Sequence, residues 1–270
     1  MSAQHLDPAS EPVGDREEPV TLHRQDGVVT IVLNQPRRKN AMTMEAWRLL
    51  GEHLATVTLG EDRVVVVTGA GEDFCAGADL SGDNGDAHSL ANMAVVNAAC
   101  LALHRSPVPT VARVDGVAVG AGMNLALACD FVVASSRARF SEIFIKRGLS
   151  VDFGGAWTLP RLVGLQKAKE LVLLGDILSA QEAKEAGLVN RVVEPEDLDE
   201  VVTGLVARLL ANPPIAASLS KRMLNASFEM DLIHALDTEA QNQSVNLVLD
   251  DVKEAFDAFL AKREPHFRGR

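Results

Sequence analysis

The sequence predicts an α/β core followed by an α-helical C-terminal region. Short apolar runs typical of buried strands, such as the four valines at 64–67, alternate with longer amphipathic stretches of helical period. From residue 196 onward the pattern is helical throughout and is interrupted only by Pro213 and Pro214. Strands that alternate with helices favour an α/β architecture. We find no repeat of fixed period and no linker that would divide the chain into two folding units.

The N-terminal part of the chain predicts a leader, a hairpin and a helix, in that order. Residues 1–19 are polar, acidic and rich in proline, which predicts a disordered leader. The strands expected at 20–24 and 28–33 flank an Asp-Gly pair, a strong signal for a hairpin turn. Thr43 is the expected N-cap of a helix that ends near residue 57.

The same patterns place the remaining elements. Apolar runs predict strands at 63–68, 110–114, 131–134, 138–140 and 188–193. Helical periodicity predicts helices at 89–104, 165–174 and 179–186, and a further helix that ends near residue 163. We expect an irregular segment at 144–157 and a mobile, Gly/Asp-rich loop at 81–88.

Composition limits the classes of function. The chain has 270 residues, of which 47% are hydrophobic, and this is ordinary for a globular protein with a sizeable core. Its net charge is −11. Binding to nucleic acid is not expected, because phosphate contacts need clustered Lys and Arg. Three widely spaced cysteines without a Cys/His cluster predict buried free thiols and no metal site. No apolar run is long enough to span a membrane, and the N-terminus lacks a hydrophobic signal core, so we expect a cytoplasmic protein without membrane contact.

Two glycine-rich loops are the strongest candidates for a functional site. The segments GEDFCAGADL (71–80) and GVAVGAGMNL (116–125) each follow a predicted buried strand. Glycine lets the backbone turn sharply and approach a ligand, and the second segment opens a helix whose first amides have no intrahelical acceptor. Two converging N–H groups stabilise a thioester or ester oxygen that becomes anionic during a reaction. A tight turn without a ligand is the alternative for either loop alone.

At these segments the chain resembles the enoyl-CoA hydratase/isomerase (crotonase) family. The resemblance extends from about residue 20 to 267 and is carried by five ordered blocks: FCAGADL, the VDG–GAG–CD block, GLSVDFGGAWTLPRLVG, LLGDILSAQEAKEAGLVN and AFLAKREPHF. It implies a crotonase-like spiral of ββα turns over 20–200, with a C-terminal helical trimerisation region over 201–270. It also implies homotrimers, often paired into hexamers, and an acyl-CoA substrate in which coenzyme A is part of the thioester, with no tightly bound cofactor.

The resemblance assigns roles to individual residues. The amides of Ala78 and Ala121 match the oxyanion hole, and the Ala76 carbonyl matches the position that meets the CoA adenine. Lys262 matches a tail lysine that approaches the CoA phosphates, often from a neighbouring subunit. Arg38, within a basic stretch of three residues, is a second candidate for this charge, although such residues are more often simply solvated. Other positions expected to contact the substrate are Gly77, Asp79, Leu80 and Gly120.

Two departures from the family pattern argue against hydration. The hydratases use two glutamates to position water and move protons, and the matching positions here hold Asn124 and Phe144. Neither side chain exchanges protons near neutral pH. The resemblance therefore implies an isomerase rather than a hydratase.

Asp152 is the candidate that replaces both glutamates. It lies in an apolar setting that would raise its pKa, and it matches the acid/base aspartate of ring-epoxide and dienoyl-CoA isomerases. The same position holds the nucleophile of the family's dehalogenases. One carboxylate is enough for a 1,3-proton shift. In the alternative, non-catalytic interpretation Asp152 caps the helix that begins at Gly154 or Gly155.

The remaining candidates and functions stay open. Glu142 lies two positions from the family's second glutamate and is expected to be a surface carboxylate. His88, in the predicted mobile loop, could reach the site but is more simply exposed. One alternative function is a hydratase with an altered site, in which Asp152 acts on a water held by Asn124. The non-enzymatic alternative is an inactive protein that binds CoA esters.

Overall fold

The computed structural model describes residues 18–80 and 89–270. Its main sheet has six strands in the order β1-β2-β3-β4-β6-β9, parallel throughout except for the antiparallel β1–β2 pair. These strands are β1 (Val20–Gln25), β2 (Val28–Leu33), β3 (Val64–Gly69), β4 (Thr110–Val114), β6 (Phe131–Ser135) and β9 (Arg191–Val193). A smaller sheet has the order β5-β7-β8, with bounds Val117–Val119, Arg139–Ser141 and Leu178–Ser179. The predicted α/β class is confirmed.

The hairpin predicted from the Asp-Gly pair is confirmed. Gln25 pairs with Val28, and Asp26 and Gly27 between them have φ angles of 50° and 79°. Positive φ at both central residues is the geometry of a type I′ turn, which suits the twist of the flanking strands. Both strands lie close to the lengths that the sequence predicts.

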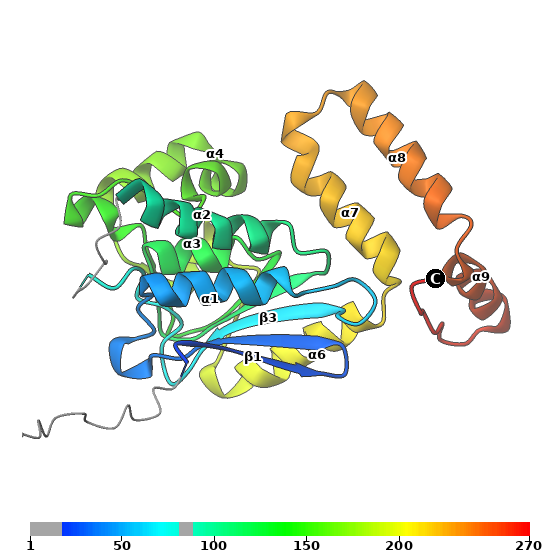
Figure 1. Cartoon of the computed structure of the whole chain (residues 1–270), viewed down its shortest axis with the longest axis horizontal. Coiled ribbons are helices and arrows are strands. Elements are labelled where there is room, and N and C mark those ends of the chain that lie inside the picture. The colour runs from blue at the N-terminus through cyan, green and yellow to red at the C-terminus, as the bar shows by residue number, and fades with distance from the viewer. Residues whose placement is uncertain (1–17, 81–88) are drawn as a thin grey trace, which may run out of the picture.

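The main sheet is covered on both faces. Val65 and Val67 of β3 belong to one hydrophobic cluster, and Val64 and Val66 belong to another. Figure 1 shows α1 and α2 on one side of the sheet and α6 on the other. Because successive strand residues point to opposite faces, a run of four valines fits a strand with both faces buried.

The helices of the core follow their predicted signals closely. They are α1 (Met44–Ala55), α2 (Ser89–His104), α3 (Ala121–Leu127), α4 (Gly155–Leu174), α5 (Ala180–Glu185) and α6 (Leu198–Leu210). Thr43 caps α1 by accepting a hydrogen bond from the Ala46 amide at 3.2 Å, and Ser179 and Glu182 form a reciprocal capping box on α5. The two helices expected around residue 164 form one run, α4, which is kinked at Gly164.

The C-terminal helices divide into one that belongs to the core and three that extend from it. Leu198, Val202, Leu205 and Val206 of α6 pack on the far face of the sheet, so the core continues past residue 200. The others are α7 (Pro214–Ala226), α8 (Leu232–Asn246) and α9 (Asp250–Ala261). Figure 1 shows α7 and α8 as an arm beside the core, with α9 beyond it.

Few polar contacts hold this arm to the core. Lys221 of α7 forms an ion pair with Asp130 at 2.7 Å, and Asn225 donates a hydrogen bond to the His104 carbonyl at 3.1 Å. Many apolar side chains of the arm and of α9 are exposed. These are Leu224, Phe228, Leu232, Ile233, Leu236, Val245, Leu247, Val248, Phe256, Phe259 and Leu260. In the described ranges no single helix is long and apolar enough to cross a membrane, although Pro195–Leu210 and Pro214–Glu229 qualify as a pair, bent by 105°.

One predicted strand, the three cysteines and two predicted mobile segments remain to be compared with the structure. The predicted strand at 188–193 is shorter, because the Leu188 amide turns back to the Ala183 carbonyl before β9 begins at Arg191. Cys75 and Cys129 are buried free thiols as expected, whereas Cys100 is only partly buried. The predicted leader, apart from its last two residues, and the loop with His88 lie outside the described residues.

Candidate active site

The two glycine-rich loops are hydrogen-bonded to each other. The Cys75 amide donates to the Val117 carbonyl at 2.8 Å, and the Val119 amide donates to the Cys75 carbonyl at 3.1 Å. Gly122 and Gly77 make this approach possible. A Cβ on Gly122 would lie 2.3 Å from the Cys75 carbonyl oxygen, and Gly77 has a φ of 86°.

This contact brings the two predicted oxyanion-hole positions together. A Cβ on Gly77, which precedes Ala78, would lie 3.5 Å from the Ala121 amide nitrogen. Ala121 is the first residue of α3, so its amide has no acceptor within the helix. Neither the Ala78 nor the Ala121 amide donates a hydrogen bond within the described part of the chain. Two free N–H groups are therefore available for an incoming oxygen.

Asn124 lies one helical turn beyond Ala121 and is almost completely buried. Its Nδ2 donates to the Asp152 carbonyl oxygen at 2.9 Å and lies 3.4 Å from Oε2 of Glu142. A Cβ on Gly155 would lie 2.4 Å from the same Nδ2. The absence of a side chain at Gly155 thus lets Asn124 hold the segment before α4 against α3.

Asp152 presents a free carboxyl group at this point. Gly154, not Asp152, is the N-cap of α4, and no side chain caps the helix. The capping interpretation of Asp152 is therefore wrong. Its Oδ1 is buried without a hydrogen-bond partner, and burial raises the pKa of Asp152 to about 6. Phe153, which adopts a left-handed φ of 46°, stacks on Trp47 with ring centroids 4.9 Å apart and fixes the segment.

Glu142 is not a surface carboxylate, contrary to the sequence prediction. It is only 1% exposed and directly follows Ser141, whose carbonyl accepts the hydrogen bond of the Gly120 amide at 2.8 Å. Burial raises the pKa of Glu142 to about 8, opposed by the Asn124 hydrogen bond and reinforced by the charge of Asp152. The sequence offers only a weak signal for this burial. The strand β7 ends at Ser141 and Glu142 lies just beyond it, so the alternation of strand faces from Phe140 does not decide where Glu142 points.

Phe144 contributes an apolar wall. It is 7% exposed and forms part of the 3-10 helix Ile143–Arg147. Its ring lies 3.7 Å from the place where Gly120 would carry a Cβ. The position that the resemblance matches to a hydratase glutamate is therefore occupied by an aromatic ring beside the N-terminus of α3.

The residues expected to bind CoA are only partly assembled by one chain. Arg38 is paired with Asp79, so its charge is already opposed by a carboxylate. The Ala76 amide is held by the Lys39 carbonyl at 2.9 Å, and Leu80 is 66% exposed. Lys262 ends α9, which Figure 1 shows well apart from α3 and α4. A single chain does not bring Lys262 to the other site residues.

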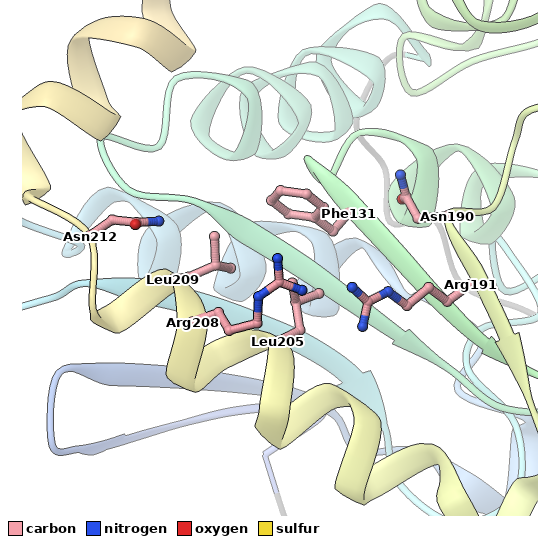
Figure 2. Close-up of a pocket in the computed structure, with 7 residues that line it drawn as sticks. All are labelled: Phe131, Asn190, Arg191, Leu205, Arg208, Leu209 and Asn212. Carbon is pink, nitrogen blue, oxygen red and sulfur yellow. The ribbon is translucent and has the colours of Figure 1, made fainter. Parts of the chain in front are cut away.

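A separate pocket lies away from these residues. A cavity of about 320 Å³ lies where β6 and β9 begin beside α6. Figure 2 shows the side chains that line it. It is lined by Phe131, Asn190, Arg191, Leu205, Arg208, Leu209 and Asn212. None of the predicted site residues lines it. Within the described ranges no group of His, Cys, Asp and Glu side chains could hold a metal ion.

The raised pKa values of the two carboxyl groups lead to a prediction about stability. An acid whose pKa is higher in the folded than in the unfolded state stabilises the fold while it is protonated, and this contribution is lost as the pH rises. For Glu142 the loss extends from its ordinary value of 4.5 to about 8. We therefore expect Glu142→Gln to raise the thermal unfolding temperature relative to wild type by several degrees at pH 9, and far less at pH 4. Both proteins are measured at one protein concentration. If the difference in unfolding temperature between variant and wild type is the same at pH 4 and pH 9, Glu142 is not a buried ionisable carboxyl group.

Known proteins of one family are similar to this chain over nearly its whole length. A family model described as enoyl-CoA hydratase/isomerase matches residues 23–270. The chain is 38% identical over 258 residues to a 1,2-epoxyphenylacetyl-CoA isomerase of Escherichia coli (strain K12), covering 93% of this chain and 98% of the relative. It is 33% identical over 256 residues to a crotonyl-CoA hydratase of Syntrophomonas wolfei, with the same coverage.

Solved structures give the same result for the fold. The crystal structure of an enoyl-CoA hydratase from Bacillus anthracis superposes with a TM-score of 0.88 at 33% identity, covering 93% of this chain and all of that one. A putative enoyl-CoA hydratase from Thermobifida fusca, solved in complex with CoA, gives a TM-score of 0.80 at 34% identity, with 85% and 93% coverage. The chain belongs to the enoyl-CoA hydratase/isomerase family and has the crotonase fold.

Proposed function

We propose that this protein is an isomerase that shifts a double bond in an acyl-CoA thioester, with Asp152 as the general base. The free, buried Oδ1 of Asp152 is the observation that carries the proposal. A general base must be mostly ionised at the working pH and still bind a proton well, and a pKa of about 6 satisfies both conditions.

The amides of Ala78 and Ala121 bind the thioester oxygen in this mechanism. Asp152 removes a proton from a carbon next to the double bond, and the electron pair passes through the conjugated system to the thioester oxygen as a dienolate. Preorganised N–H donors stabilise this charge because they need no reorientation when it forms. A proton then adds to the far carbon of the dienolate. Protonated Asp152 can supply this proton, so a single carboxylate is sufficient for the reaction.

A retained hydratase is the second candidate. The Oδ1 of Asn124 is buried without a hydrogen-bond partner and could hold a water for addition to the double bond. Hydratases stand among the relatives, as does the isomerase of E. coli. Isomerisation is preferred because Asn124 and Phe144 leave no carboxylate at either position that the hydratases use. A protein that binds CoA esters without turnover is the third possibility.

A panel of substrates separates these functions. The purified protein is incubated with 2-enoyl-, 3-enoyl- and dienoyl-CoA esters, and the absorbance of the conjugated thioester is followed together with product mass. An isomerase changes the absorbance with no change in mass, whereas a hydratase adds the mass of one water. Tight CoA binding with no change in either signal would refute both enzyme functions and favour the binding protein.

We further propose that the helical arm, together with α9, assembles the chain into trimers. Phe259 and Leu260 are 80% and 79% exposed, and exposed apolar side chains in such number are typical of a subunit interface. In an assembly, Lys262 of a neighbouring chain would supply the positive charge that binds the CoA phosphates. Arg38 is less suited to this role, because its charge is opposed by Asp79.

The assembly leads to a prediction for Phe259→Glu. We expect the wild type to sediment at three or six times the chain mass of 28.9 kDa and the variant to sediment as smaller species. The variant should also bind CoA more weakly, since a shared site would be lost. Leu59→Glu, which is exposed on the core, is the matched control and should leave both properties unchanged. A wild type that sediments as a monomer would refute the proposal.

A further inference from the structure

Three buried oxygens without hydrogen-bond partners belong to neighbouring side chains of the site. They are Oδ1 of Asn124, Oε1 of Glu142 and Oδ1 of Asp152. Asn124 connects the three residues, because its Nδ2 lies 2.9 Å from the Asp152 carbonyl oxygen and 3.4 Å from Glu142 Oε2. Buried polar atoms are normally paired, so three unpaired ones around a single amide point to a shared partner.

Burial, and to a smaller extent a neighbouring charge, raises the pKa of Glu142 and favours its neutral form. The charged side chain that acts on it is Asp152, and the two carboxyl groups repel each other when both are ionised. No ion pair to Glu142 exists in the described ranges, and Lys146 and Arg147 on the same 3-10 turn are exposed. From α2, Cys100 faces Asp152 and is a neutral thiol, because burial raises its pKa to about 11. At neutral pH the pair therefore consists of a protonated Glu142 and an ionised Asp152.

A single water molecule placed between them would satisfy all three oxygens in these protonation states. Its two hydrogens suit two acceptors, Oδ1 of Asn124 and Oδ1 of Asp152. Its lone pair accepts the proton that Glu142 donates through Oε1. Buried waters typically make about three such hydrogen bonds. The arrangement connects the two carboxyl groups by a chain along which a proton can move.

We propose that Glu142 is a relay residue that supplies the proton for the second half of the isomerisation through this internal water. The inference rests on the proposed isomerase function and extends it from one carboxylate to two. It applies to Glu142, which is not at either position of the hydratase glutamates. The role is that of a positioning residue, because Glu142 acts through water and not on the substrate directly.

The proton balance of the relay closes over one turnover. Asp152 takes a proton as the first C–H bond breaks, and the electron pair enters the dienolate. The water gives one proton to the far carbon, forming the new C–H bond, and at the same time takes the proton of Glu142. Glu142, now ionised and hydrogen-bonded by Asn124 Nδ2, then regains a proton from Asp152 through the water. The site returns to its starting state without a net gain or loss of protons.

Isomerisation in D₂O tests the relay. In the wild type we expect the product to carry solvent deuterium at the carbon that gains hydrogen, because the relay protons exchange with solvent before the reaction. Glu142→Gln cannot relay, so its product should retain the substrate's own proton, returned by Asp152. We expect kcat to fall about 10-fold, less than the roughly 10²–10⁴-fold of a group that acts on the substrate directly, because Asp152 can still return its own proton. The decline of kcat above about pH 8 should disappear in the variant.

Controls separate a relay from a structural role. Glu61→Gln, at an exposed position, should match wild type in every measurement. Glu142→Asp keeps an acid and should restore part of the deuterium incorporation, while CoA binding measured by calorimetry stays unchanged in all variants. If Glu142→Gln folds and shows wild-type rate, isotope pattern and pH profile, the relay is refuted and the isomerase proposal stands.

Failure of the proposed function gives a different result. In that case the wild type does not isomerise any ester. The relay is then tested by deuterium exchange at Cα of butyryl-CoA, because this exchange needs only the removal and return of a proton. Slower exchange in Glu142→Gln than in Glu61→Gln would support the relay without the isomerase. Equal exchange rates, or no exchange in the wild type, would refute the relay as well.

Discussion

Replacement of Asp152 by Asn is expected to lower kcat by about 10²–10⁴-fold, the range that general acid–base groups contribute. The amide has nearly the same shape as the carboxyl group but cannot accept a proton from carbon. CoA affinity should change little, because the contacts that hold the nucleotide part lie elsewhere in the family pattern. Turnover of the best ester from the substrate panel and calorimetric CoA binding measure the two effects.

The pH profile gives an independent view of the same residue. The base must be ionised, so wild-type kcat should rise as the pH increases through about 6. Asp26→Asn is the matched control. Asp26 is exposed in the hairpin turn, where Asn-Gly is as suitable as Asp-Gly, and this variant should retain both activity and profile. Full activity of Asp152→Asn would eliminate the carboxylate from the mechanism.

Replacement of Gly122 by Ala is expected to have the second large effect, a fall in kcat of about 10²–10³-fold, comparable to the loss of one oxyanion-hole donor. The new Cβ would lie 2.3 Å from the Cys75 carbonyl oxygen and 2.8 Å from the Cys75 Cβ. Either the start of α3 or the FCAGADL loop must move away. The amides of Ala121 and Ala78 then no longer point to one place.

Gly77→Ala should produce the same defect from the other loop. The added Cβ would lie 2.8 Å from the Val119 carbonyl oxygen, and alanine is strained at a φ of 86°. Gly204→Ala on α6 is the control, since no atom lies within 4 Å of its added Cβ and alanine favours the helix. Thermal unfolding of each variant separates loss of the fold from loss of the donors. A folded Gly122→Ala protein with wild-type kcat would refute the proposed oxyanion hole.

Local sequence patterns determined a large part of the fold. The Asp-Gly hairpin, the caps at Thr43 and Ser179 and the doubly buried valine strand depend on neighbours a few residues away. Such features are set by turn chemistry, capping hydrogen bonds and side-chain period, all of which are visible in the chain. The glycine pattern identified the two loops, and the family resemblance singled out Asn124, Phe144 and Asp152.

Only the tertiary structure decided the chemistry of the carboxyl groups. Whether Asp152 caps α4 or remains free depends on the backbone angle of Gly154, and the burial of Glu142 depends on α3 and the segment before α4 packing over it. The pairing of Arg38 with Asp79 and the packing of α6 on the sheet are likewise long-range contacts. The pKa of a carboxyl group is set by the solvent and charges that surround it in space. The sequence by itself therefore identified the family and its loops, and the packing showed that two acids, the buried Glu142 and the half-buried Asp152, meet at Asn124.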